Sequence, residues 1–293
     1  MRRMPNRLSF LARIAVFLLV LTSGHAWSAP AAPAAPVALV TIQSGPATAL
    51  RDENKLAVVE GAAILPGDIL ELPAQALLLK LEFNDGAALL MSPGSRVLIA
   101  PRLAGDRAGS RVYVLAGWVK MAAPANVSFK LTSPQADLQG SGASAVLGLG
   151  ATGVQVFAEN GDWQLKHAGA PNLALKRGDF AVLPSGTAKF DASGRPTPQF
   201  LQSLPRAFMD TLPSRAAMFQ GKSVTLKALG PVTYADAKDW IDAEPALRRA
   251  EISRWRNLAR DEDVRQTLIA DLKNHPEWEP ILFPSAPASA KSK

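Results

Sequence analysis

The stretch ALLLKLEFNDGAALLM, residues Ala76–Met91, decides the fold class of this chain. Two short aliphatic runs flank the turn Asn84-Asp85-Gly86, where glycine tolerates the positive φ that a tight turn demands. From residue 37 to about 190, similar runs of β-branched or aliphatic residues are separated by Gly, Pro, Asp and Asn. This spacing is typical of an all-β domain. We expect a mainly β domain over 37–190, with short strands in a β-sandwich or solenoid-like arrangement.

Two glycine-containing stretches add to this prediction. Glu159-Asn160-Gly161 separates the runs VQVFA and WQLK, and we expect it to form a second hairpin turn. Just before it, Gly148-x-Gly150-x-x-Gly153 has the spacing of a dinucleotide-binding loop. Such a loop ends a strand and opens a helix, whereas here the alternating run Val154–Ala158 and then a turn follow. The sequence therefore predicts a bend or bulge between strands, and no cofactor.

Length and composition favour a globular protein with a sizeable core, since the chain has 293 residues and 48% of them are hydrophobic. The absence of cysteine excludes disulfides, thiol nucleophiles, thiolate metal sites and a lipid-anchored precursor. Of the net charge of +7, four charges belong to Arg2, Arg3, Arg7 and Arg13, which leaves +3 for the rest of the chain. The basic balance therefore does not indicate a nucleic-acid partner.

The N-terminus has the pattern of an export signal. Arginines lead into the apolar run Ile14–Leu21, and small residues follow that fit cleavage after Ser28. We therefore expect residues 1–28 to be a signal peptide and the protein to be periplasmic or secreted. The alternative is an uncleaved membrane anchor, but Leu8–Leu21 is interrupted by Arg13 and is shorter than the roughly 20 apolar residues of a membrane span.

Five stretches follow one another in a recognisable order: GDILELPAQALLLKLEFNDGAALLMSPGSRVLI, RVYVLAGWVKM, FKLTSPQADLQGSGASAVL, VQVFAENGDWQL and LKRGDFAVLPSG. In this order they resemble the FecR domain family, which runs Gly-Asp, an aliphatic strand, an Asp-Gly turn, a Pro-x-Ser turn, Gly-x-Val, a Thr-x-Pro-x-Ala segment and a final Leu-x-x-Gly. The resemblance covers about Val37–Ser185 and implies a periplasmic β domain. We expect the Pro/Ala stretch 29–36 before it to be a linker.

Two features depart from the family pattern. The corner that is usually Arg-Gly-Thr is here QGSGASAV. In signalling members of the family, a cytoplasmic anti-sigma segment precedes a membrane helix. In this chain about a dozen residues precede the hydrophobic run, and a segment of that length is too short to fold. We therefore do not expect direct regulation of transcription.

The pattern changes after a linker that we expect at 191–199. Helical periodicity over 200–284 predicts a small α-helical region, and the tail 285–293 is expected to be disordered, which gives an α+β protein overall. Thr233-x-x-Asp236 has the form of a capping box, and Pro245 stands where a helix can begin. Apolar residues then recur at helical spacing in two groups: Leu247, Ile252, Trp255, Leu258 and Ala259, followed by Val264, Leu268, Ile269 and Leu272.

The helix expected to begin at Pro245 carries the candidate interaction surface. Arg249, Arg256 and Arg260 project within about 40° of one another when each residue turns an α-helix by 100°. This strip suits an anionic partner such as a phospholipid headgroup or an acidic envelope polymer. The alternative, which we favour, is a solvated flank paired with neighbouring carboxylates, because exposed runs of charge commonly have this role.

Candidate catalytic and metal-binding residues are few. His275 lies two residues before Glu277, but neither it nor His167 has a paired ligand motif nearby. We therefore expect a structural role for His275, with the neighbouring apolar residues folded against the helices or the β domain: Trp278, Ile281, Leu282 and Phe283. The sequence also lacks G-x-S-x-G and His-Glu-x-x-His, so no catalytic or metal-binding residues are expected.

The sequence favours a non-catalytic exported protein whose β domain binds a periplasmic or envelope protein, or a cell-wall polymer. The alternative is a cell-wall glycan hydrolase or lytic accessory protein that uses carboxylates such as Asp236 and Asp239. A third possibility is that the N-terminal hydrophobic run is not cleaved and anchors the protein in the membrane. The protein would then relay a signal, and this run would be its membrane contact. Trp118 and Trp163 are further surface candidates, although core packing is expected for both.

Overall fold

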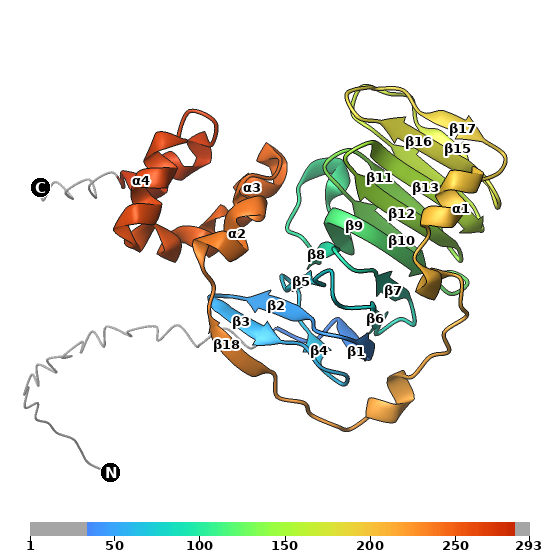
Figure 1. Ribbon diagram of the computed structural model, residues 1–293, viewed down its shortest axis with the longest axis horizontal. Coiled ribbons are helices and arrows are strands. Elements are labelled where there is room, and N and C mark those ends of the chain that lie inside the picture. Colours follow the sequence, from blue (N-terminus) through green and yellow to red (C-terminus); the bar gives the residue numbers. More distant parts are fainter. Residues whose placement is uncertain (1–33, 285–293) are drawn as a thin grey trace, which may run out of the picture. The chain divides into compact units, whose positions relative to one another are not determined.

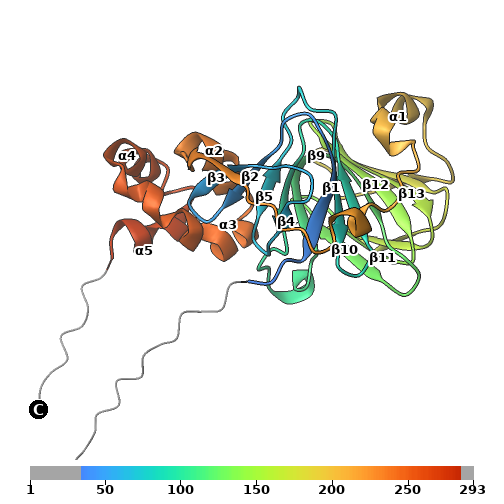
Figure 2. The same ribbon diagram turned by 90° about the horizontal axis from the view of Figure 1, so that it is seen from below.

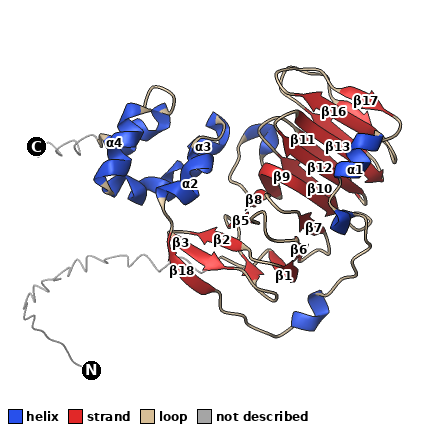
Figure 3. Cartoon of the chain, viewed as in Figure 1, coloured by secondary structure: helices blue, strands red, loops and turns tan. Residues whose placement is uncertain are grey.

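The computed structural model describes residues 34–284, so the export signal, most of the linker at 29–36 and the C-terminal tail lie outside the described residues. The described chain contains 18 strands (Figures 1 and 3). They are β1 (Ala38–Ser44), β2 (Thr48–Arg51), β3 (Asn54–Ala57), β4 (Ala63–Ile64), β5 (Ile69–Glu71), β6 (Leu78–Phe83), β7 (Ala88–Met91), β8 (Arg96–Ile99), β9 (Val112–Ala122), β10 (Ser128–Thr132), β11 (Asp137–Ser141), β12 (Ser144–Gly150), β13 (Gly153–Asn160), β14 (Trp163–Lys166), β15 (Leu173–Leu175), β16 (Phe180–Pro184), β17 (Asp191–Ser193) and β18 (Lys227–Pro231).

The helices are short and, apart from one single turn, lie toward the C-terminus. The α-helices are α1 (Pro198–Ser203), α2 (Tyr234–Ile241), α3 (Pro245–Glu251), α4 (Glu262–Ala270) and α5 (Glu279–Leu282). The 3₁₀ helices are η1 (Gly105–Arg107), η2 (Arg206–Phe208), η3 (Ala216–Phe219), η4 (Ile252–Arg260) and η5 (Pro276–Trp278). Thr233 and Asp236 form the expected capping box of α2, and Pro245 occupies the first turn of α3. Within residues 34–284, none of the helices has the length and apolar character needed to cross a membrane.

Strand β9 holds the sheet together because it hydrogen-bonds along both of its halves. Its first half pairs with β8 and, in parallel, with β10, while its second half pairs with β7 and β12. The strand bends at Gly117, whose φ is +88°. A Cβ atom at this position would lie 2.5 Å from Cα of Ser95, so only glycine lets β9 approach the residue before β8 this closely.

The predicted fold class, a β-sandwich or solenoid-like arrangement in an α+β protein, is wrong. Through β9 all strands join one curled 18-stranded sheet, in which the strand pairs of residues 34–284 are antiparallel apart from β9 with β10. The protein is mainly β with a small helical region. Strands also occur where none was expected: β17 lies in the supposed linker and pairs with β16, and β18 lies in the supposed helical region and pairs with β3.

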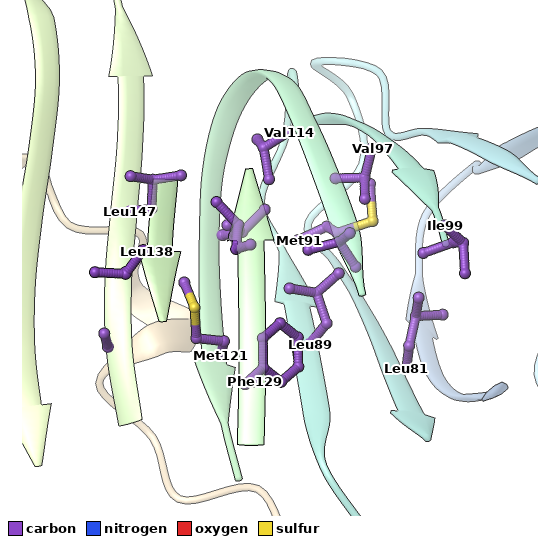
Figure 4. Close-up of a cluster of buried hydrophobic side chains, with 14 of the residues drawn as sticks. Leu81, Leu89, Met91, Val97, Ile99, Val114, Met121, Phe129, Leu138 and Leu147 are labelled. Carbon is purple, nitrogen blue, oxygen red and sulfur yellow. The ribbon is translucent and has the colours of Figure 1, made fainter. Parts of the chain in front are cut away.

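The main hydrophobic core lies on the inner face of the curled sheet. Alternate residues of each strand contribute to it, because successive side chains of a strand point to opposite faces. In β6 these are Leu79, Leu81 and Phe83, and in β9 they include Val114 and Met121. Figure 4 shows such side chains from several strands meeting in one cluster. The alternating sequence pattern therefore sets which residues enter the core.

The outer face of the sheet is covered in two places by the C-terminal part of the chain. Outward residues of β2, β5, β8 and β9 form a second cluster with the helices α2 to α5. Figure 2 shows these helices beside β2, β3 and β5. Both groups of apolar residues expected at helical spacing take part in this cluster. A third cluster joins outward residues of β6, β7, β12 and β16 to Phe200 of α1 and Phe208 of η2. Most long strands consequently have apolar residues on both faces.

The glycine motif shapes strand packing. β12 and β13 are antiparallel, and Gly150 pairs with Gly153 across a tight connection. Gly148 gives room to the indole of Trp118, since a Cβ atom there would lie 2.8 Å from the ring. Gly153 has a φ of +123°, and its Cβ atom would lie 2.0 Å from the carbonyl oxygen of Leu183. A strand follows these glycines, as expected, rather than the helix that a dinucleotide site requires.

The two predicted hairpin turns have different outcomes. Asn84-Asp85-Gly86 connects the antiparallel neighbours β6 and β7, which confirms the first hairpin. The second prediction is wrong, because β13 pairs with β12 and β16, whereas β14 pairs with β11 and β15. After Gly161 the chain crosses to other strands, and the fully buried indole of Trp163 donates hydrogen bonds of 3.2 Å to the carbonyl oxygens of Ser144 and Asn160.

Because of these contacts, an alanine substitution should destabilise the protein far more at Gly153 than at Gly150. We expect Gly153→Ala to lower the free energy of unfolding by about 2 kcal/mol or more, through the positive φ and the clash with Leu183. Gly150→Ala is the matched control, since no atom lies within 4 Å of its Cβ position, and its effect should stay within about 0.5 kcal/mol. Urea unfolding of both variants measures the difference. Equal stabilities would contradict this account of the motif.

Candidate binding groove

A groove of about 510 Å³ runs over the outer face of the sheet at β6, β7, β9, β12 and β13. Its floor is formed by the side chains that alternate with those of the main core, among them Lys80, Lys120 and Ser144. One wall is formed by Met209–Leu212 and Ser214, which belong to the segment 204–215 that we call the strap; it consists of the 3₁₀ turn η2 and an irregular stretch after it. The strap lies between α1 and η3 and continues toward β18 (Figure 1).

Aromatic contacts anchor the strap at its N-terminal end. Phe200 lies against Phe180, with ring centroids 4.5 Å apart, and against Trp118 at 5.6 Å. Phe208 is almost fully buried in the same cluster. Helix α1 begins in a fixed position because the Thr197 side chain accepts a hydrogen bond from the amide of Phe200. This end of the strap is held by apolar burial.

The remainder of the strap is held by charged side chains of the sheet. Nζ of Lys80 donates to the carbonyl oxygens of Leu212, at 3.2 Å, and Pro213, at 2.8 Å. Nζ of Lys120 donates to the carbonyl oxygen of Phe208 at 2.7 Å. These bonds involve the main chain of the strap and so do not depend on the identity of its side chains.

Glu82, a negatively charged residue of the same strand as Lys80, also binds the strap. Its carboxylate accepts hydrogen bonds from the Ser214 hydroxyl and from the amide of Arg215, the latter at 2.9 Å, and lies 3.0 Å from Nζ of Lys80. The side chains of Lys80 and Glu82 are only 4% and 6% exposed. Burial alone would raise the pKa of Glu82, but the hydrogen bonds from Ser214, Arg215 and Lys80 outweigh it and lower the pKa to about 2.

Further charged groups line the part of the groove that the strap leaves open. Lys120 lies 2.7 Å from the Glu159 carboxylate, which also accepts a hydrogen bond from the Ser144 hydroxyl. Arg177 and Asp210 line the groove as well. Within residues 34–284, neither of these two has an oppositely charged side chain within 4.0 Å. Hydrogen-bonding groups of both kinds are thus available to a polar occupant.

The arginines predicted as an interaction surface do not share one α-helix. Helix α3 ends at Glu251 and the 3₁₀ helix η4 follows, which has about three residues per turn. Arg256 and Arg260 are therefore separated by about 120° around η4 instead of about 40°. Arg249 lies 3.8 Å from Glu277, and Nε of Arg256 donates to the carbonyl oxygen of Ser253. A role of these residues in binding stays a prediction.

The carboxylates considered for glycan cleavage have partners in the fold. Asp236 caps helix α2 and lies 2.5 Å from Nζ of Lys55, while Asp239 forms an ion pair with Arg96 of β8. Both carboxylates thereby connect the helical region to the sheet. Carboxylates that form such ion pairs differ from the catalytic acid and base of a glycosidase, which face the substrate.

Both histidines within residues 34–284, His167 and His275, also have defined surroundings. Nδ1 of His167 contacts the carbonyl oxygen of Gln135. His275 is 8% exposed and lies close to Asp242 and Asp271, which sequence reasoning did not connect with it. Trp278 and Leu282 pack into the helical cluster as expected, whereas the expectation is wrong for Phe283, which is 52% exposed. Trp163 is a core residue, and Trp118 packs under α1.

Sequence reasoning missed Lys80 and Glu82. Their signal is the alternation of LLKLEF, in which Leu79, Leu81 and Phe83 enter the core and the residues between them face outward. Outward charges on a strand are ordinarily solvated, so the pattern gives no reason to expect their burial. Only the strap, about 130 residues later in the sequence, buries them.

Comparison with known proteins adds little to this picture. No family model matches the chain, and no curated protein matches it. Two solved structures of a protein described as a "putative anti-sigma factor" from Parabacteroides distasonis ATCC 8503, at 1.65 and 2.50 Å resolution, are similar to it with a TM-score of 0.36 and with 14% and 13% identity. The matches cover 43% of this chain and 59% of that protein, so the chain spans less than two thirds of its length.

The lowered pKa of Glu82 predicts how stability depends on pH. The folded pKa, about 2, lies below the ordinary value of 4.5, so the carboxylate stabilises the folded state above pH 4.5 and loses this effect as the pH falls toward 2. We expect urea unfolding to show a smaller loss of stability between pH 5 and about 2.5 for Glu82→Gln than for the wild type. The exposed Glu262→Gln is the control and should follow the wild type. Parallel curves for all three proteins would refute the role given to Glu82.

Proposed function

We propose that this chain is an exported, non-catalytic envelope protein whose β domain binds an extended polypeptide segment of a partner protein in the groove beside the strap. One observation carries this proposal: Lys80 and Glu82 bind main-chain carbonyl and amide groups of the non-helical stretch Leu212–Arg215, and Lys120 binds the carbonyl oxygen at the end of η2 before it. Any extended polypeptide offers the same groups, so the strap acts as an internal example of what this face recognises.

The unfilled part of the groove supports an additional occupant. Arg177 offers a cationic group and Asp210 an anionic one, next to the Lys120 and Glu159 pair. A polypeptide carries carbonyl acceptors, amide donors and charged side chains, and can therefore use all of these groups. A uniformly charged polymer would meet as many like charges as opposite ones on this surface.

The same proposal includes a location in the cell envelope and membership of the FecR domain family. Location is supported by the pattern of residues 1–28, and membership of the FecR domain family by the order of the motifs between Val37 and Ser185. In this proposal the helical region stabilises the domain by covering the outer face of the sheet, and the groove makes the contact with the partner.

A peptide with the sequence of the strap provides a direct test. Asp210–Ser214 is replaced by Gly-Ser-Gly-Ser-Gly, which removes the side chains and much of the fixed conformation of this part while retaining Phe200, Phe208 and Arg215. We expect a labelled peptide PRAFMDTLPSRAA, residues 205–217, to bind this variant saturably in fluorescence anisotropy. Adding Lys80→Met should weaken binding by about tenfold or more, because the hydrogen bonds from Nζ of Lys80 to the carbonyl oxygens of residues 212 and 213 are lost.

Lys166→Met, on β14 and outside the groove lining, is the matched control and should leave peptide affinity unchanged. Circular dichroism checks that each variant keeps its strand content. Absence of saturable binding, or equal losses from both lysine substitutions, would count against polypeptide recognition by this face.

Crosslinking in cells tests the location of the partner. Met209 lines the groove and is 71% exposed, whereas Met218 is 56% exposed and lies outside the groove lining. A photoreactive amino acid at position 209 should give a crosslinked polypeptide whose yield falls with Lys120→Met, and the same group at position 218 should not. Equal crosslinking from the two positions would place the contact elsewhere.

A further inference from the structure

Three potential metal ligands meet at the C-terminal ends of two helices. Asp242 follows the last residue of α2, Asp271 follows the last residue of α4, and His275 immediately precedes η5. Each offers a ligand atom, and these atoms lie within 4.8 Å of one another. Asp242 and His275 are far apart in sequence, which is why no ligand spacing is visible there.

The orientation of the His275 ring is the second observation that points to a cation. The imidazole is 8% exposed, so its polar atoms have little access to water. Nδ1 lies 3.0 Å from a carboxylate oxygen of Asp271, and Nε2 faces Asp242 Oδ1 at 4.0 Å, too far for a hydrogen bond. No hydrogen bond to Nε2 is present among residues 34–284. When Nε2 carries the proton of the neutral imidazole, Nδ1 directs its lone pair at the Asp271 carboxylate 3.0 Å away, and a cation between these two atoms would satisfy both groups.

We propose that Asp242, Asp271 and His275 bind a divalent zinc-class ion, with water in the remaining coordination position. A mixed imidazole and carboxylate set suits Zn²⁺, whereas Mg²⁺ and Ca²⁺ prefer oxygen ligands alone. Ligand atoms 4.8 Å apart have to approach one another before one ion contacts all three at about 2.1 Å. The side chains of Asp242 and Asp271 are 34% and 44% exposed, so both have room to rotate.

One competing cation is already present. Lys238 forms an ion pair with Asp242 one helical turn away, and its side chain is 54% exposed. Exposed pairs of this kind contribute little, so a divalent ion can displace the ammonium group from the carboxylate. The Asn274 amide donates to the other oxygen of Asp271, at 2.6 Å, and helps to orient that carboxylate.

Metal binding would connect α2, α4 and the segment before η5. These short elements otherwise depend on the apolar cluster that they share with the outer face of the sheet. An ion that binds only the folded arrangement stabilises it in proportion to the logarithm of its concentration above the dissociation constant. The site is distinct from the groove, and neither proposal depends on the other.

The test uses the tag-free chain, with calorimetric titration of ZnCl₂ and thermal unfolding at increasing Zn²⁺. We expect one tight site per chain and a rise in Tm with Zn²⁺, with no such rise for Mg²⁺ or Ca²⁺. Asp271→Asn and Asp242→Asn should each weaken Zn²⁺ binding by about tenfold or more, and Lys238→Gln should strengthen it. His167→Gln is the control for a histidine outside the cluster. With Co²⁺ in place of Zn²⁺, ligand-field absorption should appear in the wild type and be lost in Asp271→Asn.

The aspartate variants keep this test decisive even if a substitution of the buried His275 prevents folding, since both carboxylates are partly exposed. Absence of Zn²⁺ binding, or binding of undiminished affinity in both Asp271→Asn and Asp242→Asn, would overturn the proposal. Binding that His167→Gln abolishes would instead assign the ion to the other histidine and would also overturn it.

Discussion

The path of β9 is the constraint on which the rest of the structure depends. Its two halves have different neighbours, and the bend at Gly117 is possible only where a strand carries no Cβ. Because the same strand pairs on both sides of the bend, the sheet curls and its inner face closes around the main core. The outer face of the sheet also carries apolar residues, such as Leu50, Leu98 and Tyr113, whose burial away from water is favourable. The C-terminal helices cover them.

Much of this arrangement follows from local sequence. Alternation in LLKLEF fixes which residues of β6 enter the core, Asn84-Asp85-Gly86 fixes the first hairpin, and Thr233 with Asp236 fixes the start of α2. These features depend on residues a few positions apart. The second turn was misread because a Gly turn permits a hairpin without requiring one, and the buried Trp163 places β14 beside β11 instead. Likewise, apolar periodicity correctly located the buried side of residues 247–259 but did not reveal the change from an α-helix to a 3₁₀ helix after Glu251.

The candidate sites lay beyond sequence reasoning for a related reason. Lys80 and Glu82 become a recognition pair only when the strap covers them, and Asp242 meets His275 only after α2 and α4 have packed together. In both cases the informative relation is between residues many positions apart. A single sequence contains no periodic or motif-level trace of such a relation. The arginine strip shows the opposite error. Regular spacing predicted that Arg249, Arg256 and Arg260 share one face of an α-helix, but the α-helix ends at Glu251 and a 3₁₀ helix follows.

The buried pair of Lys80 and Glu82 also bears on how the groove can work. Taking both charges out of water costs free energy, which their mutual attraction and the hydrogen bonds from Ser214 and Arg215 offset while the strap is in place. Phe208 of the strap and Phe200 of the preceding α1 supply apolar attachment. Leu212 to Arg215 are held by hydrogen bonds that water or another polypeptide can replace. Exchange of the polar half therefore leaves the apolar anchor, and with it the sheet, in place. In the proposed function, a partner would replace these hydrogen bonds by offering the same main-chain groups as Leu212 to Arg215.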